Sequence, residues 1–126
     1  MPPRVKSRLL RNPESISSLV EEFVDAIARH GAAAEAGAYK TTNKQYKRYD
    51  KLRKRLEQKG EAGRHAIHAL LEHSNPWVRL VAASIYLKYR EAEATKVLEA
   101  VERDTGIVGF NAKMVLREWR AGRLHP

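Results

Sequence analysis

A 30-residue repeat occupies the second half of the sequence and constrains the fold more than any other feature. Residues 61–90 align with residues 91–120 without a gap. The matched apolar positions are Ile67 and Val97, Leu71 and Val101, Val78 and Val108, Ala82 and Ala112, Ile85 and Val115, and Tyr86 and Leu116. Each copy breaks once, at residues 74–76 and 104–106. Two helical segments per copy predict stacked helical hairpins, because neither hairpin buries its apolar face alone.

The fold class follows from the same periodicity elsewhere in the chain. Apolar residues recur at helical spacing, and no alternating run is bounded by Asn-Gly or Asp-Gly turns. We therefore predict an all-α protein, a right-handed α-α superhelix of about six helices. The expected helices span residues 16–36, 39–59, 61–73, 76–90, 92–104 and 106–121. A flexible basic arm at residues 1–15 is expected to precede a single domain, residues 16–126, with repeat units at 61–90 and 91–120.

The first helix carries a start signal and an ambiguous end. Ser18 and Glu21 have the spacing of a capping box. Gly31 opens an Ala-rich segment, so the helix either ends there or continues to about Ala36 with Gly37 as its stop. We favour the longer helix. The predicted core contains Leu19, Phe23, Ile27, Leu56, Ile67, Leu71, Val78, Ala82, Ile85, Val101, Ala112, Val115 and Leu116.

The turn and second helix of the first repeat copy resemble a HEAT repeat. The resemblance rests on Asn75-Pro76-Trp77-Val78-Arg79, followed by Ala82-Ala83 and Ile85-Tyr86. The second copy departs from the HEAT pattern at Gly109, where the family has arginine, and at Lys113. The resemblance implies that Arg79 ties neighbouring repeats together through loop carbonyls or an acid, with Asp104 as a candidate acceptor. It implies no particular function, because HEAT arrays serve many unrelated roles.

The whole chain from about Ile16 to Arg120 is also similar to a family of small bacterial proteins known only as a domain of unknown function. The residues that carry this second resemblance are Ala36-Gly37-Ala38-Tyr39-Lys40, Asn43-Lys44-Gln45-Tyr46 and Asp50-Lys51-Leu52, followed by the turn at residues 75–79. The resemblance implies an α-α superhelix and nothing catalytic. Some small superhelical proteins of this kind are immunity proteins that block a toxin domain, which is one hypothesis for this chain.

Positive charge is concentrated in one segment. The chain has 24 Lys and Arg against 15 Asp and Glu, a net charge of +9 and a basic isoelectric point. Residues 40–59 alone contain nine basic and two acidic side chains. Nearly the whole excess therefore lies on the predicted second helix, and such an excess favours an acidic protein or a nucleic acid as the partner.

The basic residues of this helix align on one face, as a ridge about 20 Å long. Its members are Lys44, Lys47, Lys51, Lys54 and Arg55, with Lys40, Arg48 and Lys59 beside them. The alternative is a solvated face in which Asp50 pairs with Lys54 and Arg53 with Glu57, each pair contributing only about 0.3–0.5 kcal/mol. A ridge that binds a partner is expected either to dock on an acidic protein or to follow a nucleic-acid backbone.

Other residues complete the candidate set. Tyr39, Tyr46 and Tyr49 either stack nucleobases or, as we prefer, belong to the core with their hydroxyls at its rim. Trp77 covers a core edge unless it is exposed, in which case it becomes an interface anchor. The binding residues predicted are Asn43, Lys44, Lys47, Arg48, Lys51, Lys54, Arg55 and Trp77.

No catalytic, metal or cofactor site is predicted. The sequence has no cysteine, no nucleophile elbow, no phosphate-cradling Gly-rich loop and no dinucleotide fingerprint. His65, His68 and Glu72 share one helix face, but three ligands from one helix make a weak metal motif. No stretch is long enough to cross a membrane and no secretory signal is visible, so we expect a cytoplasmic protein. The leading hypothesis is a non-catalytic interaction module, of immunity or adaptor type, and the alternative is a nucleic-acid-binding protein.

Overall fold

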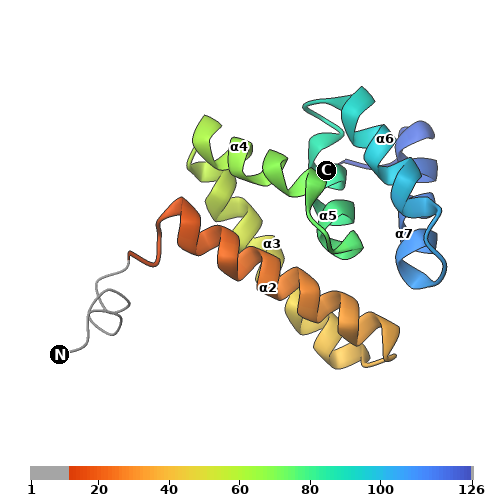
Figure 1. The fold of residues 1–126 in the computed structure, drawn as a ribbon, viewed down its shortest axis with the longest axis horizontal. Coiled ribbons are helices and arrows are strands. Elements are labelled where there is room, and N and C mark those ends of the chain that lie inside the picture. Colours follow the sequence, from red (N-terminus) through yellow and green to blue (C-terminus); the bar gives the residue numbers. More distant parts are fainter. Residues whose placement is uncertain (1–11, 126) are drawn as a thin grey trace.

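The computed structural model describes residues 12–125, and over that range the protein consists of six α-helices and one short 3₁₀-helix, with no strand (Figure 1). The elements are α2 (Ile16–Glu35), α3 (Tyr39–Gln58), α4 (Glu61–Ala69), η1 (Leu70–Glu72), α5 (Pro76–Tyr86), α6 (Glu91–Glu102) and α7 (Ile107–Arg120). For these described residues the prediction of an all-α protein is confirmed. Most of the predicted basic arm, residues 1–11, lies outside the described residues, and residues 12–15 form the turn that enters α2.

Helix α2 begins one turn before the predicted capping box. Ser15 is its N-cap, and the Ser15 hydroxyl accepts a hydrogen bond of 3.2 Å from the Ser18 backbone N–H. Ser18 itself is buried inside the first turn, so the capping-box assignment to Ser18 and Glu21 was wrong. The helix continues through Gly31 to Glu35, as the longer of the two alternatives predicted, and Gly37 follows it with a φ of 71°.

Two helices end earlier than their apolar pattern suggests. Helix α4 tightens into η1 after Ala69, and α5 stops at Tyr86, although no Gly or Pro follows it before residue 90. After α5 the chain buries Leu87 and places the Tyr89 ring 5.5 Å from the Tyr86 ring. Tertiary packing, not local propensity, therefore ends this helix.

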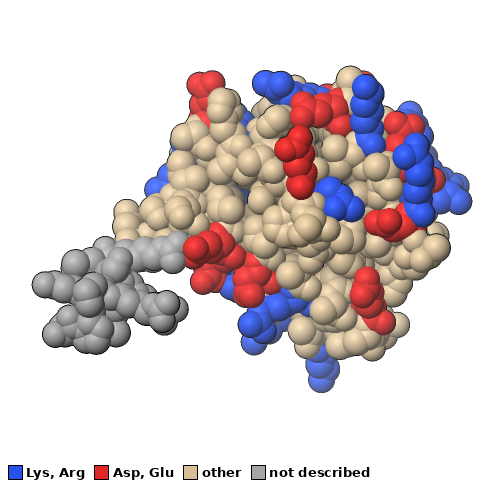
Figure 2. All heavy atoms as spheres, in the orientation of Figure 1, with Lys and Arg blue, Asp and Glu red and all other residues tan. Residues whose placement is uncertain are grey.

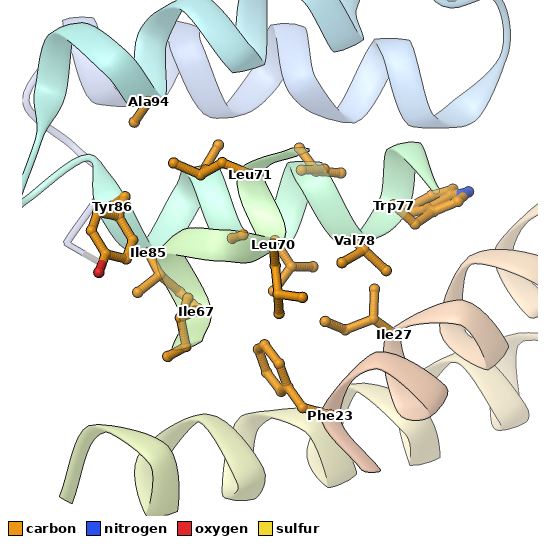
Figure 3. Packing of buried hydrophobic residues seen from close by; sticks show 14 of the residues in the cluster. Phe23, Ile27, Ile67, Leu70, Leu71, Trp77, Val78, Ile85, Tyr86 and Ala94 are labelled. Atoms are coloured by element: carbon orange, nitrogen blue, oxygen red, sulfur yellow. The ribbon is translucent and has the colours of Figure 1, made fainter. Parts of the chain in front are cut away.

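The buried residues form one continuous cluster that draws on all six helices. Figure 3 shows Phe23 and Ile27 of α2 directed toward the layer that contains Ile67, Leu70 and Val78. Every predicted core residue is buried except Val115, which is only partly buried against the cluster. Each pair of matched positions in the two repeat copies also includes at least one buried member.

Helix α5 occupies the middle of the molecule. It packs against α2 on one side and against α6 and α7 on the other, while α3 packs against α2 and α4 (Figure 1). Helix α3 thus lies at one end of the array and is covered by neighbours along only part of its surface. Within the described part of the chain, none of the helices has the length and apolarity that crossing a membrane demands.

Candidate functional site

Helix α3 exposes most of its surface. Among its 20 residues only Leu52 and Leu56 are buried, because α2 and α4 cover a single narrow side. The helix starts without a side-chain cap on its free N–H groups, and the Thr42 hydroxyl instead donates to the Ala38 carbonyl at 3.0 Å. Helix α3 is therefore exposed to solvent along its whole length, and the predicted basic ridge lies on this exposed surface.

Half of the basic residues on α3 are neutralised by acids. Arg48 donates to Asp25 at 2.9 Å and also binds Glu22, which ties α3 to α2. Arg53 lies between Asp50, at 2.9 Å, and Glu57, at 2.7 Å. Weaker contacts join Lys54 to Asp50 at 3.4 Å and Arg55 to Glu14 at 3.5 Å. These four cations are thus paired with carboxylates of the same chain, and they add little to the net positive charge that a binding partner would meet.

The carboxylates in these pairs respond electrostatically to their cations. The hydrogen bond from Arg48 lowers the pKa of Asp25 below its usual value, with a further contribution from Arg29. Burial on its own raises the pKa of Asp50, but the hydrogen bonds from Arg53 and Lys54 outweigh it and lower the pKa of that carboxyl. Both acids are therefore held in the ionised form that neutralises α3.

Four other lysines on α3 are exposed and have no carboxylate partner among residues 12–125. They are Lys40, Lys44, Lys47 and Lys51. Their spacing of four, three and four residues places them in one line along the helix, about 16 Å long. We call these four residues the lysine stripe. The predicted ridge is thus divided between a structural set of cations and an unpaired set.

A groove of about 850 Å³ runs between the lysine stripe and α2. Its walls include all four lysines of the stripe, Asn43, Arg48 and Arg55, with Glu14 and Glu22 on the side of α2. Figure 2 shows acidic side chains over α2 and basic side chains along the lower edge of the molecule, where the α2–α3 pair lies. We call this the basic groove. Of the predicted binding residues on α3, only Lys54 lies outside it.

The tyrosines of α3 differ from one another in exposure. The Tyr49 ring is partly buried, at 5.3 Å from the His30 ring, as the core interpretation predicts. Tyr39 and Tyr46 are 79% and 51% exposed, so they are not core residues. At about 3.6 residues per turn, these two side chains lie about a third of a turn from the lysine stripe. Aromatic and basic residues therefore occupy different faces of α3.

Trp77 was predicted as a binding residue, but it belongs to the core. The side chain is buried, at 4% exposure, and its indole N–H donates to the Glu35 carboxylate at 3.1 Å. Trp77 therefore presents very little surface to a partner, although it forms part of the wall of a groove among α3, α5 and α7. Trp77 is an anchor of the core, and its appearance beside a loop in the sequence was misleading.

A second groove, of about 470 Å³, lies among α3, α5 and α7 and was missed by the sequence analysis. Tyr46, Tyr49 and His30 line one side, and Met114 and Asn111 of α7 lie across from them with the apolar residues of α5. We call it the inner groove. A groove built by three helices separated along the chain leaves no local spacing signal, although a polar Asn111 beside the apolar face of α7 was visible.

The histidines considered as metal ligands have other partners. His68 Nε2 lies 2.8 Å from a carboxylate oxygen of Glu93 on α6, and His65 lies 3.7 Å from Glu61. Along the part of the chain that the structure describes, no three metal-ligating side chains converge. His68 therefore acts as a link between α4 and α6.

Comparison with known proteins gives a family and a fold. The family model "Domain of unknown function (DUF2019)" matches residues 17–119. The crystal structure of the protein RPA1889 from Rhodopseudomonas palustris CGA009 is similar, with a TM-score of 0.80 and 22% sequence identity. The alignment covers 92% of this chain and 98% of that one. The comparison with curated proteins found no match.

Proposed function

The chain belongs to the DUF2019 family, a domain of unknown function, and we propose that it is a non-catalytic protein-interaction module whose lysine stripe binds an acidic surface of a partner. Immunity proteins and adaptors are the kinds of protein that act in this way in the cytoplasm. The proposal includes the architecture, a short right-handed α-α superhelix with two HEAT-like units. Its support is that every matched pair of repeat positions contains at least one buried residue, and that Arg79 donates to the His73 and Ser74 carbonyls at 2.8 and 3.0 Å and lies 3.9 Å from the Asp104 carboxylate of the second copy.

The observation that carries the proposal is the division of charge on α3. Arg48, Arg53, Lys54 and Arg55 all contact carboxylates, whereas the lysine stripe has no such partner among the described residues. Like charges three or four residues apart on a helix repel by a few tenths of a kcal/mol per pair. A line of four unpaired lysines therefore opposes helix stability, and an acidic partner that neutralises it recovers this energy on binding.

One feature favours a protein over a nucleic acid. The lysine face has no aromatic side chain for bases to stack on, because Tyr39 and Tyr46 point about a third of a turn away. The acids of the basic groove, Glu14 and Glu22, do not separate the two kinds of partner, because they are paired with Arg55 and Arg48 and would repel carboxylates and phosphates alike. The alternative is that the four lysines contact the phosphates of a nucleic acid, and the experiment below distinguishes it from binding to a protein.

The test is a comparison of two double charge reversals. The first, Lys47→Glu with Lys51→Glu, inverts the middle of the lysine stripe. The second, Lys96→Glu with Lys113→Glu, makes the same change in net charge at exposed positions of α6 and α7. Wild type and both variants are used to capture partners from a lysate of the source organism, and are titrated with a fluorescent DNA duplex and a single-stranded RNA.

We expect a stoichiometric protein partner that wild type and the α6/α7 variant retain and the stripe variant loses. Equal capture by all three proteins would overturn the proposal. Nucleic-acid binding that is lost only in the stripe variant, with a log–log salt slope of about −3.6 on duplex DNA for four neutralised phosphates, would replace it with the alternative. Circular dichroism of both variants checks that each remains folded.

A further inference from the structure

Three consecutive pairs of helices make up the molecule, namely α2 with α3, α4 with α5, and α6 with α7. The second helix of each pair lines the inner groove. Side chains from α3, α5 and α7 face it, together with His30 from α2 and Leu124 from the end of the chain. Its volume of about 470 Å³ lies within the range of about 300–1,000 Å³ that is usual for ligand pockets. In stacked helical arrays the surface lined by such equivalent helices is the one that binds partners.

The charged residues at the rim of the inner groove cancel one another. Arg53 is paired with Asp50 and Glu57, and Lys88 lies 3.6 Å from the remaining Glu57 oxygen. All four side chains are at most about one third exposed. No unpaired charge among these residues attracts an ion, so the groove suits an uncharged occupant.

The remainder of the inner groove is aromatic and aliphatic, with a few polar atoms that lack partners. The rings of Tyr46 and Tyr49 lie 5.2 Å apart in an edge arrangement, and Tyr49 meets His30 in the same way. Within residues 12–125 no hydrogen bond is made by the side-chain amide of Asn111 or by the Tyr49 hydroxyl. Burial raises the pKa of Tyr49, so this hydroxyl stays a donor. Such walls match an aromatic ring that carries its own hydrogen-bonding group.

The inner groove and the lysine stripe lie on two sides of the same helix. Residues of α3 that line the groove are about a third of a turn from the stripe, which is roughly 10 Å around a helix of this diameter. A peptide segment that crosses α3 can therefore contact both. Its acidic residues would meet the stripe by charge complementarity, and an uncharged residue would reach the groove.

We propose that the inner groove receives an aromatic side chain, most suitably an indole, from the same acidic partner that binds the lysine stripe. This inference rests on the proposed function and adds the second half of the recognition pattern: acidic residues followed by an aromatic anchor. Buried aromatic anchors in well-packed pockets supply much of the affinity of protein interfaces, whereas charges at the rim supply mainly steering and register. The basic groove attracts the partner and the inner groove holds it.

The experiment uses two synthetic fluorescent peptides of equal charge. Both contain four glutamates and a short neutral spacer, after which one peptide has tryptophan and the other has alanine. Fluorescence anisotropy gives Kd for wild type, for Tyr46→Ala, which removes one wall of the groove, and for Tyr39→Ala, a matched exposed tyrosine of α3 that does not line it. Asn111→Trp, which fills the groove from α7, is a second variant with an independent mechanism.

We expect the tryptophan peptide to bind wild type about tenfold more tightly than the alanine peptide. Tyr46→Ala and Asn111→Trp should remove this advantage without weakening the alanine peptide, and Tyr39→Ala should preserve it. Equal binding of both peptides to wild type overturns the inference and leaves the proposed function intact. No binding of either peptide overturns both. Binding of N-acetyltryptophanamide alone as tightly as the peptide also overturns the inference, because the groove would then act independently of the stripe.

Discussion

Gly31 shows how a single residue can be fixed by a contact far away in the sequence. It lies in the interior of α2, where glycine is usually unfavourable. The face of the Trp77 indole rests against its backbone, and a Cβ placed at Gly31 would lie 2.4 Å from two ring carbons. Trp77 is itself held by its hydrogen bond to Glu35, one turn further along α2. The absence of a side chain at Gly31 is what lets α5 approach α2 closely.

Gly31→Ala should therefore destabilise the protein even though alanine is the better helix former. Alanine gains up to about 1 kcal/mol in helix propensity. The displaced indole costs about 1–3 kcal/mol as overpacking, and more if the Glu35 hydrogen bond is lost. We expect a net loss of about 1 kcal/mol in the free energy of unfolding, measured by urea denaturation.

The matched control is the same substitution in a Trp77→Leu background, where the smaller side chain leaves room for a Cβ. There Gly31→Ala should be neutral or stabilising, which gives a coupling energy between the two sites. A stabilising effect of Gly31→Ala in the wild-type background would show that the indole moves away at little cost.

Arg48 makes the packing of α2 on α3 sensitive to acid. Because its hydrogen bond lowers the pKa of Asp25 in the folded state, the pair stabilises the fold above pH 4. That contribution is lost as pH falls through the lowered pKa of Asp25. Arg48→Met should cost up to about 1 kcal/mol at pH 7, since both partners are partly exposed.

The difference in unfolding free energy between wild type and Arg48→Met should then shrink as the pH falls below about 4 and through the lowered pKa of Asp25. Chemical denaturation at several pH values measures it. Lys44→Met removes an exposed lysine that has no carboxylate partner among the described residues, so its effect should not change over the same pH range, and it provides the comparison. A difference that stays constant down to pH 2 would mean that Arg48 acts through packing of its side-chain stem alone.

At the scale of helices, the type of secondary structure could be predicted from the sequence more accurately than the residues at which each helix ends. All six helices were predictable, because apolar spacing at a helical period is a local property that survives in the sequence. The early end of α5 was not, since it depends on burying Leu87 and on the contact of Tyr86 with Tyr89. Helix ends are decided by what the next element packs against, and this information is not local.

The candidate site divides in the same way. The alignment of lysines on α3 follows from helical geometry alone and could be predicted. Which cations are neutralised could not, because Arg48 is paired with Glu22 and Asp25, more than 20 residues earlier. Trp77 was misassigned for the same reason, since its burial depends on Gly31. The inner groove needs three helices in their final positions, so no segment of the sequence contains it.

Over the whole molecule, charge is segregated in a way that works against folding. The chain carries a net charge of +9, and the segment that forms α3 supplies most of it. Helices α2 and α6, by contrast, each carry four acidic side chains and one basic side chain, and ion pairs such as Arg48 with Asp25 and Arg120 with Glu99 join different helices. Proteins commonly retain locally unfavourable features where they bind something. The lysine stripe has the character of such a feature.

Lys44→Glu should consequently stabilise the isolated protein while it weakens partner binding. At this position glutamate would lie within one turn of Lys40, Lys47 and Arg48, so repulsions become attractions of a few tenths of a kcal/mol each. We expect a gain of about 0.5–1 kcal/mol at low ionic strength. The gain should fall as salt screens exposed charges, with a Debye length of about 10 Å at 0.1 M. Thermal melting at low and high salt measures both effects.

The control makes the same Lys→Glu substitution at a position whose neighbours are acidic instead of basic. Lys96 is exposed on α6 and lies one turn from Glu93 on one side and Glu99 on the other. Lys96→Glu makes the same change in net charge as Lys44→Glu, but it replaces attractions with repulsions and should lower the melting temperature. If both substitutions raise the melting temperature equally, the benefit comes from reducing the overall charge of +9, and the lysine stripe has no special electrostatic cost. Opposite signs would locate the unfavourable charge on α3, which is where an acidic partner would relieve it.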